Sequence, residues 1–157
     1  MQAQALDYLK SYMKSPEVVG EGRLRVFFMN VYDAQLYTNE ADFDRTKPFA
    51  IHIKYLRNIS KEKIADRSLD EMAGQGIDDD EKLETWRREM LAVFPDVKKG
   101  TTLTGVFTEN QTAVFYKNGK LSGEIKDTEF ANAFFDIWLR DDTSAPDLRR
   151  NLLGLKR

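Results

Sequence analysis

The stretch that most constrains the fold reads GEGRLRVFFMNVYDAQLYT and covers residues 20–38. It is the longest run rich in aromatic and β-branched residues, the types that favour strands. In an extended chain Leu24 falls on one face, whereas Arg23 and Arg25 fall on the other. The run predicts two successive strands, or one long strand with a bend near residues 29–30.

Alternation with a period of two recurs in two later stretches. In residues 49–56, FAIHIKYL, the apolar face includes Tyr55, and the more polar face carries His52 next to Lys54. This pattern predicts a strand in which His52 is partly exposed. Residues 100–125 read as three short strands, and Asn118-Gly119 predicts a tight hairpin turn, because both residues adopt positive φ readily. We therefore expect an antiparallel meander.

Helical spacing of apolar residues predicts five helices. They are expected over residues 2–14, over 61–73 behind a Ser60 cap, from Asp78 to the residue before Pro95, after an Asp127 cap, and from Ser144, with Asp147 completing a capping box. Strands grouped apart from helices predict an α+β fold with a largely antiparallel sheet and helices on one face. We expect a single domain over residues 1–157, with an N-terminal helix within residues 1–16 and a core over about 17–154.

Composition excludes several kinds of site. The chain has no cysteine, which excludes disulfides, thiolate metal ligands and cysteine nucleophiles, and its single histidine is His52. The net charge of −2 gives no general attraction to nucleic acid or to an anionic membrane. Asp78, Asp79 and Asp80 lie in a first helical turn, where they stabilise the helix dipole, and their spacing is not that of a calcium loop. We predict no metal site, no cofactor and no nucleic-acid partner.

No apolar run reaches the roughly 18 to 20 residues that span a bilayer, so no membrane span is expected. The start, MQAQALDYLK, lacks a basic region followed by an apolar core. Gln-Ala-Gln-Ala after Met1 is typical of a chain from which an export signal has been removed. This predicts a periplasmic or otherwise exported location, with a cytoplasmic location as the alternative.

Five strings carry a resemblance that covers residues from about 20 to 154. They are GEGRLRVFFMNVYDAQLYT, IHIKYLRNISKEKIADRSLDEM, FPDVKKGTTLTGVF, FYKNGKLSGEI and FFDIWLRDDTSAPDLRRNLLG. With them the chain resembles the chalcone isomerase-like family, and especially its bacterial members, which are usually exported. The resemblance implies an open-faced β-sandwich, in which a helical layer covers a curved antiparallel sheet. It also implies a cleft between the layers for a flat or elongated apolar ligand.

The resemblance does not extend to the catalytic residues of the family's enzymes. Their substrate-holding arginine corresponds to Arg23 or Arg25, and their threonine falls near Tyr32, which keeps a hydroxyl but adds a ring. Their tyrosine falls within residues 78–81, which are all carboxylates here. Acidic groups would oppose the negative charge that develops in chalcone isomerisation. We therefore expect no chalcone isomerase activity.

Three functional hypotheses follow. The leading one is a non-catalytic domain that binds a small apolar or amphipathic ligand, such as a fatty acid. Its expected ligand-binding residues are Arg23, Arg25, Tyr32 and Tyr55, since a guanidinium and a tyrosine hydroxyl can together hold a carboxylate. The second is an isomerase or lyase with another substrate, for which Tyr32, Tyr55 and His52 are the candidate acids and bases. The third is a structural or interaction protein with a closed core.

Overall fold

A six-stranded antiparallel sheet organises the molecule in the computed structural model, which describes residues 6–155. Each strand pairs with the next one in sequence, so the spatial order is β1-β2-β3-β4-β5-β6. The strands are β1 (Pro16–Val26), β2 (Met29–Asn39), β3 (Phe49–Tyr55), β4 (Thr102–Phe107), β5 (Ala113–Lys117) and β6 (Lys120–Ile125). The predicted α+β class and the meander over residues 100–125 are confirmed.

Residues 20–38 form two strands joined by a tight turn. Phe27 and Phe28 are the turn residues, because Val26 pairs directly with Met29 across the hairpin. The turn therefore comes two residues before the expected bend, and β1 begins at Pro16, before the predicted stretch.

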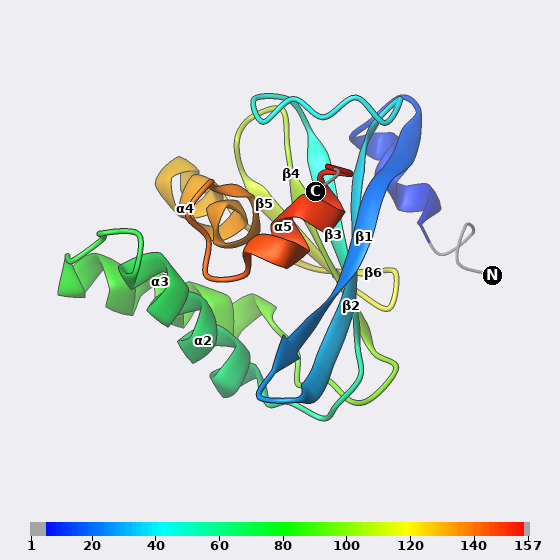
Figure 1. The fold of residues 1–157 in the computed structure, drawn as a ribbon. Helices are drawn as coiled ribbons and strands as arrows, with labels where there is room; N and C mark the ends of the chain where they lie inside the picture. Colours follow the sequence, from blue (N-terminus) through cyan, green and yellow to red (C-terminus); the bar gives the residue numbers. More distant parts are fainter. Residues whose placement is uncertain (1–5, 156–157) are drawn as a thin grey trace.

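Four α-helices lie on one face of the sheet, as Figure 1 shows. They are α2 (Lys61–Ala73), α3 (Asp80–Val93), α4 (Thr128–Leu139) and α5 (Pro146–Leu152). The side chains of Ser60, Asp79 and Asp127 accept backbone N–H groups at the starts of the first three helices, at 3.1–3.2 Å. These caps satisfy amides that have no partner within the helix.

Two helix predictions are wrong. The described part of the N-terminal segment forms only a 3₁₀ helix, η1 (Asp7–Ser11), and residues 2–5 of the predicted helix lie outside the described residues. The expected capping box at Ser144 is also absent. The residue before α5 is Ala145, and the Ser144 hydroxyl donates instead to Glu71 of α2, at 2.7 Å.

The main core lies between the sheet and the helices. Aromatic rings of α4 pack edge-on against rings of the sheet, with Phe134 5.3 Å from Phe115 and Phe135 5.1 Å from Phe49, measured between ring centroids. Burial of each such side chain contributes about 1.5–3 kcal/mol to folding. The aromatic stripe of α4 therefore fixes the helical layer to the sheet.

A second, smaller core covers the opposite face of the sheet. Leu9 of η1 packs there against Ala50 and Val106 of the central strands. His52 lies beneath this segment with only 7% of its surface exposed, so the prediction of a partly exposed histidine is wrong. Its Nδ1 is 2.8 Å from the hydroxyl of Thr104, and burial lowers the pKa of His52 to about 4. Strand alternation could not reveal this burial, because a distant segment causes it.

Candidate functional site

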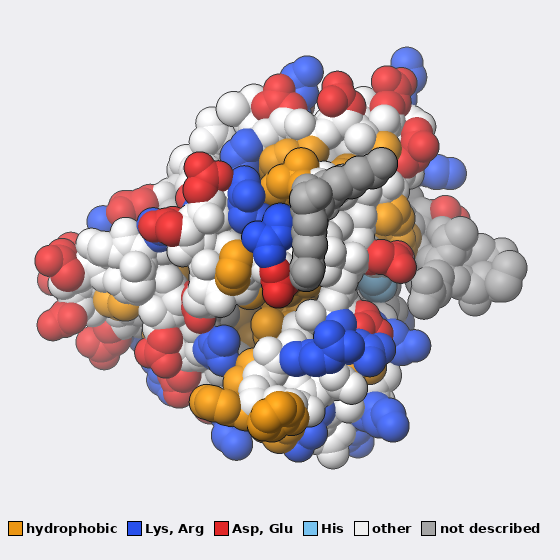
Figure 2. Space-filling view, viewed as in Figure 1, with side chains coloured by type: hydrophobic (Ala, Val, Ile, Leu, Met, Phe, Trp, Pro, Cys, Tyr) orange, Lys and Arg blue, Asp and Glu red, His pale blue; other side chains and the backbone are white. Residues whose placement is uncertain are grey.

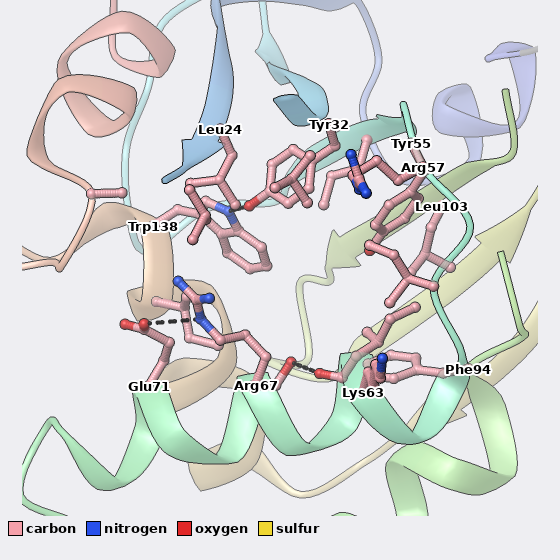
Figure 3. A pocket seen from close by; sticks show the side chains of 18 of the residues that line it. Leu24, Tyr32, Tyr55, Arg57, Lys63, Arg67, Glu71, Phe94, Leu103 and Trp138 are labelled. Carbon is pink, nitrogen blue, oxygen red and sulfur yellow. Dashed lines mark hydrogen bonds and ion pairs between the residues drawn. The ribbon is translucent and has the colours of Figure 1, made fainter. Parts of the chain in front are cut away.

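A cavity of about 480 Å³ lies between the sheet and the helical layer. Its volume is typical of sites for small molecules. Strands β1, β2 and β3 form one wall and α2 and α4 form the other (Figure 3), and residues 57–59 also contribute to the lining. Most of the lining is apolar, and it includes Leu24, Ile53, Ile64, Phe94, Leu103 and Ile137. Such a wall favours an apolar molecule or the apolar part of an amphipathic one.

Tyr32 supplies a hydroxyl whose direction of hydrogen bonding is fixed. The indole Nε1–H of Trp138 donates to this oxygen at 2.7 Å, and both side chains are buried. An indole N–H can only donate, so the tyrosine keeps its own proton for another acceptor. Burial raises the pKa of Tyr32 to about 12, against the opposing effects of the Trp138 hydrogen bond and the charge of Arg67. Tyr32 is thus a neutral donor at ordinary pH.

Tyr55 brings a second hydroxyl to the same cavity. It lies opposite Tyr32 in the β2–β3 register, and the two rings meet edge to face with centroids 5.7 Å apart. Within residues 6–155 the Tyr55 hydroxyl has no hydrogen-bond partner. Burial raises the pKa of Tyr55 as well, and the neighbouring Tyr32 raises it further. Both hydroxyls are therefore available to a ligand, and neither is poised as a base.

Cationic side chains line the cavity on the side of α2. Arg67 and Lys63 come from α2, and Arg57 comes from the segment after β3. The Nε of Arg67 lies 3.3 Å from a carboxylate oxygen of Glu71 in the next helical turn. The terminal guanidinium nitrogens of Arg67 have no partner among the described side chains, so they can bind an anion. Figure 3 shows Arg67 and Tyr32 on opposite walls of the cavity.

The structure places Arg23 and Arg25 outside the cavity. Arg23 forms an ion pair with Asp33, with Nε 2.6 Å from Oδ1, and Arg25 donates to Asn30 at 3.1 Å. Both face the other side of the sheet, whereas Leu24 between them lines the cavity. The expectation that one of these arginines enters the cleft is corrected, because the apolar residues of β1 take the inner face.

Of the other candidate residues, Tyr32 and Tyr55 do come together in the cavity. His52 does not, because it points to the opposite face of the sheet. Residues 78–81, which match the position of the family's tyrosine, do not line the cavity either. The isomerase or lyase hypothesis thus loses its only imidazole, and the two tyrosines that remain both have raised pKa values.

Sequence reasoning missed Arg67 and Trp138. A signal for Arg67 was present, because it follows Ile64 by three residues and so shares a helix face with a predicted core residue. Trp138 was assigned to the core stripe of its helix, and no local pattern indicates its hydrogen bond to Tyr32.

Over residues 6–155 no group of three or more His, Cys, Asp or Glu side chains could hold a metal ion. None of the helices in this part of the chain has the length and apolar character needed to cross a membrane.

Comparison with known proteins agrees with the architecture. A protein of Haemophilus influenzae described only as uncharacterized is 25% identical over 126 residues, which make up 80% of this chain and 61% of that protein. The chain thus spans about three-fifths of that relative's length. The crystal structure of the Arabidopsis thaliana fatty-acid binding protein AtFAP1 matches with a TM-score of 0.70 at 11% identity, over 88% of this chain and 87% of that one. At this identity the match shows a common fold.

The family model described as chalcone isomerase-like matches residues 17–154. This match covers all six strands except the first residue of β1, and all four α-helices. The resemblance found in the five sequence strings is thereby confirmed, and this chain belongs to the chalcone isomerase-like family.

Proposed function

We propose that this chain binds a small amphipathic molecule, such as a fatty acid, in the cavity between the sheet and the helices, without chemically changing it. The observation that carries the proposal is the Trp138–Tyr32 hydrogen bond, which leaves the Tyr32 proton free inside an apolar cavity. A buried donor without an acceptor is unfavourable, so the cavity is suited to a ligand that carries an acceptor.

The head group of the ligand is expected between Tyr32 and Arg67. The nearby charge of Arg67 acts on the Tyr32 hydroxyl, since it is among the causes that lower that group's pKa. A carboxylate there can accept from the tyrosine and from the free guanidinium nitrogens together. Hydrogen bonds to a charged acceptor are about twice as strong as neutral ones. This donor set favours an anionic head over a neutral one.

The apolar part of the ligand is expected along the far end of the cavity. Phe94 and Leu103 line that end. Figure 3 shows Phe94 and Leu103 on the side of the cavity away from Trp138 and Glu71. Burial of an aliphatic chain there contributes about 0.8 kcal/mol per methylene, so affinity should rise with chain length until the cavity is full.

The comparisons support the proposal in a limited way. The fold matches that of a protein described as fatty-acid binding, and family membership is consistent with an interlayer cleft. The exported, periplasmic location stays a prediction, which fractionation of cells that make the chain would test.

The experiment pairs extraction with binding. Denaturing mass spectrometry of an organic extract of the purified protein would identify a retained lipid. Thermal unfolding would then be followed with fatty acids of increasing length and with the alcohols of equal length. We expect stabilisation by the acids, rising with length, because a ligand that binds only the folded state stabilises it. The alcohols, which lack the charge, should stabilise much less.

The control variants separate the head-group contacts from the fold. Arg67→Gln should reduce the stabilisation by the acids while leaving the smaller effect of the alcohols unchanged. An empty extract together with no shift for any acid would contradict the proposal. Equal shifts with acids and alcohols would retain an apolar site but reject the head-group assignment.

A further inference from the structure

The turn between β1 and β2 exposes two adjacent aromatic side chains. Phe27 is 88% exposed and Phe28 is 104% exposed, and the following Met29 is 43% exposed. A single exposed apolar residue is ordinary, but three in succession at the tip of a hairpin form a protruding apolar surface. Packing within the chain does not explain these residues, because the two rings contribute almost nothing to the core.

The backbone of this turn does not favour phenylalanine either. Phe27 has φ of 48° and Phe28 has φ of 70°, in the left-handed region that is unfavourable for residues with a bulky side chain. The β5–β6 hairpin also has a two-residue turn with positive φ, and it uses Asn118 and Gly119, with φ of 49° and 83°. Asn-Gly is the pair that such turns prefer. The Phe-Phe pair therefore runs against local backbone preference, which indicates a binding role.

Basic residues surround this end of the sheet. The segments after β3 and before β4 meet there, with the amide of Gly100 donating to the carbonyl of Tyr55 at 2.8 Å. The β5–β6 turn lies beside them, with Asn118 Oδ1 accepting from the amide of Thr102 at 2.9 Å. The exposed cations of these segments and of the hairpin tip are Arg25, Arg57, Lys98, Lys99, Lys117 and Lys120.

Figure 2 shows this distribution of charge, with Lys and Arg side chains around the apolar hairpin tip at the lower end and acidic side chains mainly at the upper and left edges. The cationic character is local, because the whole chain has a net charge of −2.

We propose that this end of the molecule docks on the surface of an anionic lipid bilayer. Phe27 and Phe28 insert among the head groups and the first part of the acyl chains, and the surrounding lysines and arginines contact lipid phosphates. Aromatic rings flanked by cations fit this interface, since burial of the rings and attraction to anionic lipids add together. A second copy of the chain would need a matching acidic and apolar surface, and the test below distinguishes this outcome from docking on a bilayer.

The hairpin tip adjoins the ligand cavity, so docking would bring the cavity close to the bilayer. Val26 and Met29, which flank the two phenylalanines, also line the cavity, as does Arg57. Docking would therefore place one end of the cavity against the bilayer, where an amphipathic ligand could enter without crossing water. This consequence rests on the proposed ligand binding, whereas the docking itself does not.

The test is flotation of the full chain with vesicles. Vesicles of phosphatidylcholine mixed with phosphatidylglycerol are compared with vesicles of phosphatidylcholine alone, both free of fatty acid. We expect binding to the mixed vesicles only, and weaker binding as salt is added, because salt screens the exposed charges. The double variant Phe27→Asn, Phe28→Gly gives the turn its preferred residues, so its fold should be retained and its melting temperature should not fall. Its binding should be weaker by at least roughly tenfold.

Two matched controls accompany this variant. Val18→Thr removes an exposed apolar side chain at the opposite end of the same hairpin and should bind like the wild type. Lys98→Gln with Lys99→Gln removes two charges near the tip and should weaken binding by roughly 30-fold. Lys14→Gln with Lys47→Gln also removes two positive charges, but at the far end of the sheet, and should have little effect on vesicle binding.

Several results would overturn the docking proposal. The wild-type chain could fail to float with the mixed vesicles, or the Asn-Gly variant could bind as well as the wild type. Analytical sedimentation of the wild-type chain and of the Asn-Gly variant would show whether the wild type forms a dimer that the variant does not. Such a dimer, together with no vesicle binding, would mean that the hairpin tip binds a second copy of the chain. Because no fatty acid is present, failure of docking leaves the proposed ligand site intact. Failure of ligand binding likewise leaves the docking result intact.

Discussion

Trp138 and Tyr32, 106 residues apart in the sequence, join the helical layer to the sheet through one buried hydrogen bond of 2.7 Å. The indole belongs to α4 and the phenol to β2, and both line the cavity. The bond therefore holds two opposite walls together and also sets the role of Tyr32 as a donor toward the cavity. The same contact serves stability and recognition, and these two roles can be separated by mutation.

Tyr32→Phe should destabilise the fold and weaken ligand binding. The variant leaves the Trp138 N–H buried without an acceptor, which costs about 1–3 kcal/mol. Urea unfolding of the ligand-free protein measures this loss. Tyr55→Phe is the matched control, because its hydroxyl has no partner among the described residues, and its free energy of unfolding should stay within about 1 kcal/mol of the wild type. Equal destabilisation by the two variants would contradict the structural role given to the Trp138–Tyr32 bond.

Arg67→Gln should reduce the affinity for a fatty acid by roughly 10- to 100-fold, because a hydrogen-bonded charge contact is worth about 1.5–3 kcal/mol. Arg23→Gln should leave this affinity unchanged, since Arg23 is paired with Asp33 outside the cavity. Titration of each variant with one fatty acid checks both expectations. If Arg23→Gln weakened binding and Arg67→Gln did not, the site would lie on the other face of the sheet.

The sequence predicts most of the fold because its signals are local. The caps at Ser60 and Asp127 and the Asn118-Gly119 turn each depend on neighbouring residues, and all appear in the structure. The burial of His52 and the bond between Trp138 and Tyr32 depend on segments far apart in sequence. Local patterns carry no information about such contacts.

The arginines of β1 show a different kind of error. Alternation already separated Leu24 from Arg23 and Arg25, and the apolar face of a strand is the one that packs on the core. The analogy with the family's catalytic arginine favoured the opposite face. The structure follows the alternation, so the physical pattern was the better guide than the positional analogy.

Gly20→Ala should destabilise the protein by about 3 kcal/mol, near the upper end of what overpacking a well-filled core costs. A Cβ atom at Gly20 would lie 2.0 Å from the carbonyl oxygen of Asn151, so α5 would have to move away from β1. Gly74→Ala is the control. Gly74 follows α2 in a right-handed helical conformation, and alanine should change stability there by less than about 1 kcal/mol. Thermal unfolding of both variants measures the difference, and similar melting temperatures would show that α5 is not held closely against β1.

His52 should make the protein less stable as the pH falls from about 6.5 to about 4. The pKa of His52 is lowered to about 4 in the folded protein, mainly by burial and then by the charge of Lys54, whereas its ordinary value is 6.5. Between these values the unfolded chain takes up a proton that the folded chain does not. Across this window the free energy of unfolding should therefore decrease by about 1.4 kcal/mol per pH unit on account of this group.

The measurement for His52 is a difference between two proteins. Urea unfolding of the wild type is measured at pH 7, 6 and 5 and compared with that of His52→Gln. The comparison is needed because carboxylates also titrate below pH 5, and they do so equally in the two proteins. Glutamine can still accept a hydrogen bond from Thr104, as the imidazole Nδ1 can. The wild type should lose stability relative to the variant as the pH falls. Parallel curves would mean that His52 takes up its proton as readily in the folded protein as in the unfolded chain, and hence that the segment over it opens readily to water.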